Sequence, residues 1–284
     1  MPALVVPFTK MHGAGNDFLV LDNRFLHFSH DELADLARRF CPRHFGVGAD
    51  GILALSPPSA DASEQGHDYR MDYVNPDGSR AGMCGNGARC LARFARSAGL
   101  ASEPLVFGSD DGTYRASMPD DPEADVRLFV PSPKRFDPKH VLEAGGTVPY
   151  VWTGTHHTVV FVRDVETANV AKIAPRIRHD AAFAPEGTNV NFVEVLSEAP
   201  ARVKVRTFEK GVEAETLACG TGALAAALVP RLMGRVEDTE VEVVARGGTL
   251  RVGFRLDEGD GQAVVRDLWL EGPAVTVFQG TLEL

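Results

Sequence analysis

The chain has 284 residues, of which 44% are hydrophobic, and carries a formal net charge of −10 with a pI of about 5.4. This length suits one large domain or two ordinary ones, and the apolar fraction is enough for a packed core. An acidic chain without a basic patch argues against binding to nucleic acid or to an anionic membrane surface, so we expect neither partner.

The cysteines and the N-terminus indicate the compartment. The N-terminus lacks the charged start and long apolar run of a signal peptide, and the longest apolar stretch, residues 217–229, is too short to cross a bilayer. Four cysteines do not make a disulfide scaffold in a chain of this length. We therefore expect a cytoplasmic protein with free thiols.

The first half is predicted to alternate strands and helices. The expected strands lie at residues 4–9, 18–21, 52–55, 69–74, 105–107 and 113–118. A loop at residues 12–17 should join the first two. Ser29 followed by Glu32 is a capping-box pattern, which predicts a helix over the apolar stripe that follows. A second helix should follow Cys84 and end near Gly99.

The second half is expected to repeat this scheme after an acidic linker at residues 119–125. Its predicted helix at residues 166–173 precedes one at residues 222–233 that is apolar on nearly every side and must be enclosed by other structure. The expected strands lie at residues 150–152, 159–162, 189–195 and 202–208, with a final strand, 274–284, crossing back to the first half.

These elements predict an α/β (α+β) fold of two pseudo-symmetric halves, each a curved mixed sheet wrapped around a central helix. The N-terminal half is expected at residues 1–122, joined by the final strand, and the C-terminal half at residues 123–273. The first half carries Cys84 and the second Cys219.

Both of these cysteines stand just before a glycine-punctuated turn that runs into an alanine-rich and leucine-rich helix, about half a chain length apart. A helix start leaves backbone N–H groups unpaired and is the positive end of the dipole, so it favours a thiolate and binds carboxylate or phosphate. If the two helix starts face one another, they hold an anionic group between two thiols. By contrast, Cys41 and Cys90 are predicted to be packing residues.

Two such thiols suit inversion at an amino-acid α-carbon. One group removes the proton while the other returns a proton to the opposite face, so the pair must be in opposite protonation states. The carbanion's charge spreads onto the carboxylate, which helix N-termini stabilise. Neither pyridoxal phosphate nor a metal is then required, and we expect no cofactor.

The chain resembles the diaminopimelate epimerases in an ordered set of stretches. They lie at residues 10–18, 75–79, 83–90, 186–192 and 206–223. The resemblance implies cofactor-independent epimerisation of LL-diaminopimelate to meso-diaminopimelate, in lysine and cell-wall precursor biosynthesis, in a cleft between two pseudo-symmetric halves. A homodimer is among the assemblies that the sequence allows.

The resemblance also implies roles for individual residues. Cys84 and Cys219 are the acid and base, and His157 and Glu209 assist them. Backbone N–H groups at the two helix starts receive the reacting carboxylate; they belong to Gly85, Asn86, Gly220 and Thr221. The residues expected to hold the substrate are Asn16, Asn75, Asn189, Glu209 and Lys210.

Four departures from the family pattern affect contacts at the distal end of the substrate. Lys210 stands where the family usually has arginine, which replaces a bidentate carboxylate grip by a point charge. Thr155, His156 and His157 replace the usual Asn-Pro-His. Gly51 occupies a position where glutamine is frequent, and one extra residue precedes Glu215.

Two alternatives remain open at this point. A racemase of the proline or hydroxyproline type also pairs cysteines at helix starts, but Asn75 and Asn189 suit a second polar amino-acid end better. A thiol redox or metal-binding protein would use Cys84, Cys219 and His157, but the usual C-x-x-C spacing is absent. Asn75 and Asn189 also suit turns.

Overall fold

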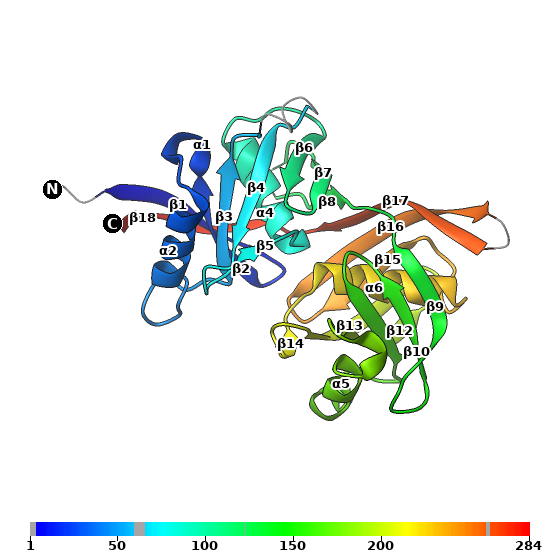
Figure 1. Ribbon diagram of the computed structural model, residues 1–284. Coiled ribbons are helices and arrows are strands. Elements are labelled where there is room, and N and C mark those ends of the chain that lie inside the picture. The colour runs from blue at the N-terminus through cyan, green and yellow to red at the C-terminus, as the bar shows by residue number, and fades with distance from the viewer. Residues whose placement is uncertain (1–3, 60–65, 122, 260–261) are drawn as a thin grey trace. The chain divides into compact units, whose positions relative to one another are not determined.

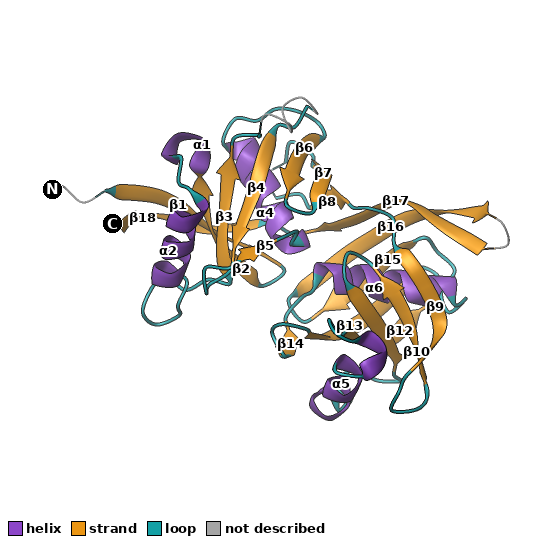
Figure 2. Cartoon of the chain, viewed as in Figure 1, coloured by secondary structure: helices purple, strands orange, loops and turns teal. Residues whose placement is uncertain are grey.

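The computed structural model describes residues 4–59, 66–121, 123–259 and 262–284. The chain forms two compact units, one of Met1–Leu128 with Gly272–Leu284 and one of Phe129–Glu271. The division falls after the acidic segment predicted as a linker, of which residue 122 lies outside the described residues. The fold is mixed α/β, mostly strand with few helices, as predicted (Figure 1, Figure 2).

The first unit contains a sheet that joins both ends of the chain. Its strands are β1 (Val5–Gly13), β2 (Asn16–Asp22), β3 (Gly51–Ser56), β4 (Tyr69–Val74), β5 (Arg80–Ala81), β6 (Leu105–Ser109), β7 (Gly112–Ser117) and β18 (Val275–Glu283), followed at the boundary by β8 (Val126–Phe129). Strand β18 pairs antiparallel with β1, β1 pairs with β2, β2 runs parallel to β3, and β4 lies between β3 and β6.

Two helices cover the two faces of this sheet. The apolar stripe of α2 (His30–Phe40) packs against Ile52 and Ala54 of β3, and the predicted capping box at its start is confirmed. Leu53, which points the other way, lies against Gly87 of α4 (Gly85–Ser97). Strand β3 is therefore buried on both faces. A single turn of helix, α1 (Asn23–Leu26), follows β2.

The predicted loop at residues 12–17 is wrong, because β1 and β2 continue into it as a tight hairpin. Only Ala14 and Gly15 separate the strands, and both have positive φ, 51° and 84°, as a two-residue hairpin turn requires. A Cβ on Gly13 would come within 2.9 Å of the Asn86 carbonyl oxygen. The hairpin tip therefore packs directly on the first turn of α4.

The second unit is a sheet wrapped around α6 (Gly220–Leu232). All of the residues from Gly220 to Pro230 except Thr221 are buried, which confirms the predicted enclosed helix. The strands of this unit are β9 (Lys134–Val141), β10 (Thr147–Trp152), β11 (His156–Phe161), β12 (Asn189–Ser197), β13 (Arg202–Glu209), β14 (Ala214–Thr216), β15 (Glu240–Ala245), β16 (Gly248–Gly259) and β17 (Gln262–Gly272).

These strands pair in sequence order from β9 to β13, then β15 to β17, with the short β14 alongside β13. The β11–β12 and β13–β15 pairs are parallel, and the others are antiparallel. Within the part of the chain that the structure describes, no helix combines the length and the hydropathy that a membrane span requires.

The helix predicted at residues 166–173 is wrong in position, because α5 spans Val170–Arg178. Asn169 caps it by accepting a hydrogen bond from the Lys172 N–H at 3.2 Å. The preceding carbonyls of Val165, Glu166 and Ala168 instead accept hydrogen bonds from the Arg206 guanidinium. That interaction holds the segment before Asn169 out of the helix. A 3-10 turn, η1 (Ala181–Phe183), follows.

Candidate active site

In the first unit, Cys84 is the N-cap residue of α4. Its backbone is extended, with φ −117° and ψ 115°, and its Sγ accepts a hydrogen bond from the Gly87 N–H at 3.5 Å. The Asn16 Oδ1 at the hairpin lies 3.6 Å from the Cys84 Sγ and accepts from the Asn86 Nδ2 at 3.4 Å. Three of the predicted site residues are thus brought together within this unit.

Asp50 fixes the orientation of the Asn16 amide. The Asn16 Nδ2 donates to the Asp50 Oδ2 at 2.7 Å, which leaves the amide oxygen facing the thiol. The carboxylate is itself held by the Asp17 N–H at 3.1 Å and by Arg43 at 3.0 Å. Asp50 was not predicted as a site residue, because its role depends on neighbours that only the folded structure brings close.

Arg89 stabilises the first turn of α4 by hydrogen bonds. The guanidinium is fully buried and donates to the Asn86 Oδ1 at 2.9 Å, the Gly85 carbonyl at 3.2 Å and the Pro273 carbonyl at 3.4 Å. Burial lowers the pKa of Arg89 from its usual value. The Asn86 side chain is engaged with Asn16 and Arg89, so its predicted contribution to an anion site is a backbone N–H.

Asn75 lies in a turn after β4. Its amide nitrogen donates to the Ser79 Oγ at 3.0 Å, and its carbonyl accepts from the Gly78 N–H at 2.9 Å. Asn75 is therefore a turn residue, which is one of the two roles that the sequence analysis left open for it.

In the second unit, Cys219 is the N-cap residue of α6 with nearly the same backbone as Cys84. Its φ is −119° and its ψ 116°, and its Sγ lies 3.5 Å from the Thr221 Oγ1. The helices that follow the two cysteines have 13 residues each. The two units therefore repeat one local arrangement of a half-buried thiol at a helix start.

His157 lies in β11 beside Asn189 of β12 and is fully buried. Its Nε2 is 3.4 Å from the Asn189 Nδ2, and its Nδ1 is 3.1 Å from the Asn191 Nδ2. Burial lowers the pKa of His157 to about 3, and the charge on Lys210 acts in the same direction. The ring is therefore neutral at physiological pH and supplies no positive charge to a thiolate.

Asn189 joins His157 to the end of β13. The Asn189 Oδ1 accepts from the Lys210 N–H at 2.9 Å, and its Nδ2 donates to the His156 carbonyl at 3.1 Å. Burial also lowers the pKa of the Lys210 ammonium, partly offset by the charge of Glu186. Glu209 is the last residue of β13 and directly precedes Lys210.

Two departures from the family pattern have local explanations. A Cβ on Gly51 would come within 2.6 Å of both the Tyr73 ring and the Val74 carbonyl oxygen, so the space of a larger residue is filled by Tyr73. His156 pairs through Nε2 with Glu186 at 2.7 Å and through Nδ1 with the Tyr150 hydroxyl at 3.0 Å.

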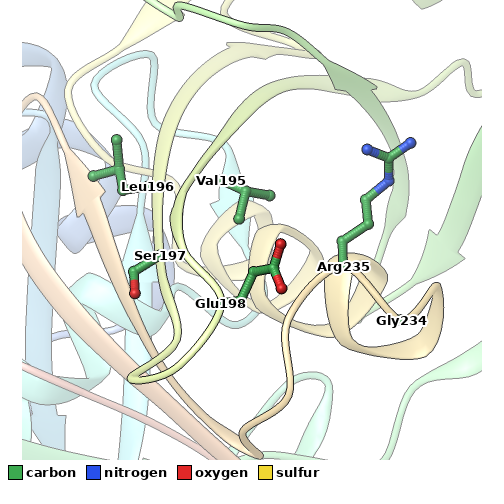
Figure 3. A pocket seen from close by; sticks show the side chains of 6 residues that line it. All are labelled: Val195, Leu196, Ser197, Glu198, Gly234 and Arg235. Carbon is green, nitrogen blue, oxygen red and sulfur yellow. The ribbon is translucent and has the colours of Figure 1, made fainter.

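A pocket of about 510 Å³ lies elsewhere in the second unit (Figure 3). Its lining consists of Val195, Leu196, Ser197, Glu198, Gly234 and Arg235. These residues lie at or just beyond the C-terminal ends of β12 and α6, whereas Asn189 and Cys219 lie at the N-terminal ends, and none of the lining residues is a predicted site residue. Among the described residues, no group of three or more His, Cys, Asp or Glu side chains is placed to hold a metal ion.

Comparisons with known proteins cover nearly the whole chain. The model of the family described as Diaminopimelate epimerase matches residues 8–129 and 150–267. The diaminopimelate epimerase of Aquifex aeolicus (strain VF5) is 39% identical, with 97% of each chain covered. That of Methanothrix thermoacetophila is 40% identical, with 97% of this chain and 95% of the relative covered.

Solved structures share the fold at low sequence identity. A PhzF-family phenazine biosynthesis protein of Bacillus anthracis has a TM-score of 0.71 at 15% identity, with 98% of this chain and 99% of that chain covered. A hydroxyproline epimerase of Agrobacterium vitis has a TM-score of 0.66 at 19% identity, with 100% and 93% covered. At these identities the likeness establishes the fold alone.

Proposed function

The chain belongs to the diaminopimelate epimerase family and is an isomerase, and on this basis we propose that it converts LL-diaminopimelate to meso-diaminopimelate by proton transfer between two cysteines. The observation that carries the proposal is the repeated cap: Cys84 and Cys219 have the same backbone conformation at the start of equally long helices. Inversion without a cofactor needs two such groups of matched chemistry.

In the proposed reaction, one cysteine acts as a thiolate and removes the α-proton, while the other acts as a thiol and donates a proton to the opposite face. The reverse reaction exchanges their roles. After each turnover the two sulfurs hold the opposite protonation states, so the pair titrates and acts as a unit. The helix starts favour the thiolate form of each in turn.

The negative charge of the carbanion spreads onto the α-carboxylate in this scheme. We assign the backbone N–H groups of Gly85, Asn86, Gly220 and Thr221 to this carboxylate, because the first N–H groups of a helix have no intrahelical partner. The buried Arg89, which grips the Gly85 carbonyl and the Asn86 amide, supports this assignment by keeping the first turn of α4 rigid. Preorganised donors of this kind stabilise developing charge without reorganisation.

The remaining polar residues are assigned to substrate binding. Asn16, held by Asp50, presents its amide oxygen beside Cys84. Asn75, Asn189, Glu209 and Lys210 complete the proposed set, with His157 and Glu209 assisting the thiols. Lys210 would bind a carboxylate as a point charge rather than through a planar fork.

The proposed reaction places the protein in lysine and cell-wall precursor biosynthesis. It requires neither pyridoxal phosphate nor a metal, because the two thiols and the helix N-termini supply the chemistry. We propose the cytoplasm as its location, since a reducing compartment keeps both thiols unbridged.

Substrate assays decide between this proposal and its nearest rival. Purified enzyme is incubated separately with LL-diaminopimelate, L-proline and trans-4-hydroxy-L-proline, and the stereoisomers are resolved by chiral chromatography. We expect turnover of LL-diaminopimelate alone. Turnover of proline or hydroxyproline without turnover of diaminopimelate would replace the proposal by a proline-type racemase.

A metal or redox function is tested on the same preparation. Elemental analysis should find far less than one zinc per chain, and a chelator should leave the rate unchanged. Stoichiometric metal, with activity lost on chelation and restored by zinc, would support the metal-binding alternative instead.

A further inference from the structure

Asn191 lies at the centre of a buried chain of polar contacts in the second unit. It is fully buried and stands two residues after Asn189 in β12, so both side chains lie on the same face of the sheet. Thr207, its register partner in β13, lies on one side, and His157 and Thr158 of β11 lie on the other. Three adjacent strands therefore position one amide.

The neighbours of Asn191 fix which way its amide points. The Thr158 carbonyl, which can only accept, lies 2.9 Å from the Asn191 Nδ2. The Asn191 Oδ1 accepts from the Thr207 hydroxyl at 2.9 Å. The second hydrogen of the amide nitrogen is left for the His157 Nδ1 at 3.1 Å, and that ring nitrogen must therefore be an acceptor.

The other ring nitrogen faces a second amide whose orientation is also fixed. The Asn189 Nδ2 donates to the His156 carbonyl, and its Oδ1 accepts from the Lys210 N–H, so the amide nitrogen faces the His157 Nε2 at 3.4 Å. A neutral imidazole has one acceptor nitrogen. The contact at Nδ1 is the shorter of the two, which leaves the ring proton on Nε2.

We propose that Asn191 is a positioning residue that holds His157 as the neutral imidazole with its proton on Nε2. The ring is then uncharged, and its Nδ1 is occupied by the Asn191 amide and cannot act as a base. The catalytic meaning of this inference rests on the proposed epimerisation, whereas the tautomer itself is a property of the protein alone.

Burial and charge around the ring act in the same direction. The groups that face His157 and influence its titration are Lys210, after β13, and His156, its neighbour in β11, and burial is the largest contribution to the lowered pKa. A hydrogen bond from the ring to Asn191 would favour the charged form only if the amide oxygen faced Nδ1. That oxygen is engaged with Thr207.

Asn191 is also in contact with the start of α6. A Cβ on Gly222, three residues after Cys219, would come within 2.7 Å of the Asn191 Oδ1 and 3.1 Å of the Thr207 Oγ1. The absence of a side chain at Gly222 lets the first turn of the helix lie directly on this amide. Asn191 thereby ties His157 to the helix that carries Cys219.

The test is nitrogen NMR of the full-length protein labelled with ¹⁵N-histidine, with His157 assigned by comparison with His157→Gln. In the wild type we expect a pyridine-type Nδ1 and a pyrrole-type Nε2, unchanged from pH 8 to pH 5. A pyrrole-type Nδ1 in the wild type would overturn the inference without any variant.

Variants at Asn191 test whether this residue sets the tautomer. In Asn191→Asp the new carboxylate accepts a proton from Nδ1, so we expect a pyrrole-type Nδ1 and a His157 pKa raised by about 1 to 3 pH units. Asn191→Ala, which removes the donor without adding charge, should give a mixture of the two tautomers. An unaltered His157 spectrum in both variants would show that Asn191 does not control the ring.

Activity measurements connect the tautomer to the reaction. The pH profile of kcat/KM for LL-diaminopimelate should gain an acid limb in Asn191→Asp that the wild type lacks, because a titrating His157 then enters the working range. A profile identical to that of the wild type, with the tautomer reversed, would show that the state of the His157 ring does not affect the reaction. Should the wild type prove inactive on diaminopimelate, the spectra still decide the tautomer, so the two failures are distinguishable.

Discussion

At the scale of single residues, the four cysteines differ in their surroundings. Cys41 and Cys90 are buried, which raises the pKa of each to about 12. Cys84 and Cys219 are half-buried at helix starts. Iodoacetamide at neutral pH should therefore label Cys84 and Cys219 in the folded protein and leave the other two unmodified, as peptide mass mapping will show. Labelling of Cys90 as fast as Cys84 would contradict this, and denaturant should expose all four.

Asp50 offers a second prediction at this scale. Asp50→Ala removes the acceptor that orients Asn16, and we expect kcat/KM for LL-diaminopimelate to fall about 10-fold to 100-fold, the range of a lost charge-assisted hydrogen bond. Asp35→Ala is the matched control, because Asp35 is an exposed carboxylate on α2 paired only with Arg38 among its described ion pairs. Equal rates in the two variants would exclude a positioning role for Asp50.

His157 predicts a dependence of stability on acid. Its pKa in the folded chain is about 3, below its ordinary value of 6.5, so between these pH values the unfolded chain binds a proton that the folded chain does not. As the pH is lowered from about 6.5, this group should therefore reduce the free energy of unfolding by about 1.4 kcal/mol per pH unit. The reduction should be complete near pH 3. Urea titrations should show a shallower acid limb in His157→Gln. The exposed His179 supplies the control variant His179→Gln. If the free energy of unfolding depended on pH in His157→Gln as it does in this control and in the wild type, the burial argument would be contradicted.

The site residues that could be predicted from the sequence are those marked by a pattern in the neighbouring residues. Cys84 and Cys219 stand out because the glycine turns around them repeat within the chain. Asp50 and Asn191 were missed because each acts through partners in other strands or loops. Arg89 was missed because its burial and its contact with Pro273 depend on the fold, although Gly85 and Asn86 lie in its own helix. Only the fold brings those partners together.

At the scale of elements, Gly87 and Gly222 occupy the same position in α4 and α6, three residues after the cysteine. A Cβ on Gly87 would meet a methyl group of Leu53 at 3.1 Å, whereas one on Gly222 would meet the hydrogen-bonded Asn191 Oδ1 at 2.7 Å. Gly222→Ala should destabilise the protein by about 1 to 3 kcal/mol, as overpacking does. Gly87→Ala should be nearly neutral, since alanine's higher helix propensity offsets a small shift of Leu53. Equal changes in the free energy of unfolding would argue against the close contact at Asn191.

Elements with a cap or an enclosed apolar surface were predicted well, and so were strands such as β4 and β13, whereas several strands of the second unit were not. The capping box before α2 and the apolar α6 are visible in the sequence. Strands β15, β16 and β17 were missed, since charged residues such as Arg251 and Glu271 pair across neighbouring strands and hide the apolar alternation. The misplaced α5 shows the same limit, because Arg206 holds the segment before it from a strand some forty positions away.

At the scale of the whole molecule, the chain repeats one arrangement in its two compact units: a cysteine at the N-cap position and a 13-residue helix packed on a mixed sheet. The sequence predicted two halves and the pairing of the final strand with the first half, since β18 runs antiparallel to β1. A repeated thiol is what two-base inversion needs, whereas a single-base enzyme would need only one. Removing either thiol should therefore stop inversion while leaving the other unit's cap intact.

The most direct measurement is the fate of the α-hydrogen of LL-diaminopimelate in deuterated water, followed by NMR and chiral chromatography. With the wild type we predict meso-diaminopimelate that carries solvent deuterium at the inverted carbon. With Cys84→Ala and with Cys219→Ala we predict no epimerisation, in variants whose circular dichroism matches the wild type. Full epimerisation by either variant, or inversion that retains the original hydrogen, would contradict the two-thiol mechanism.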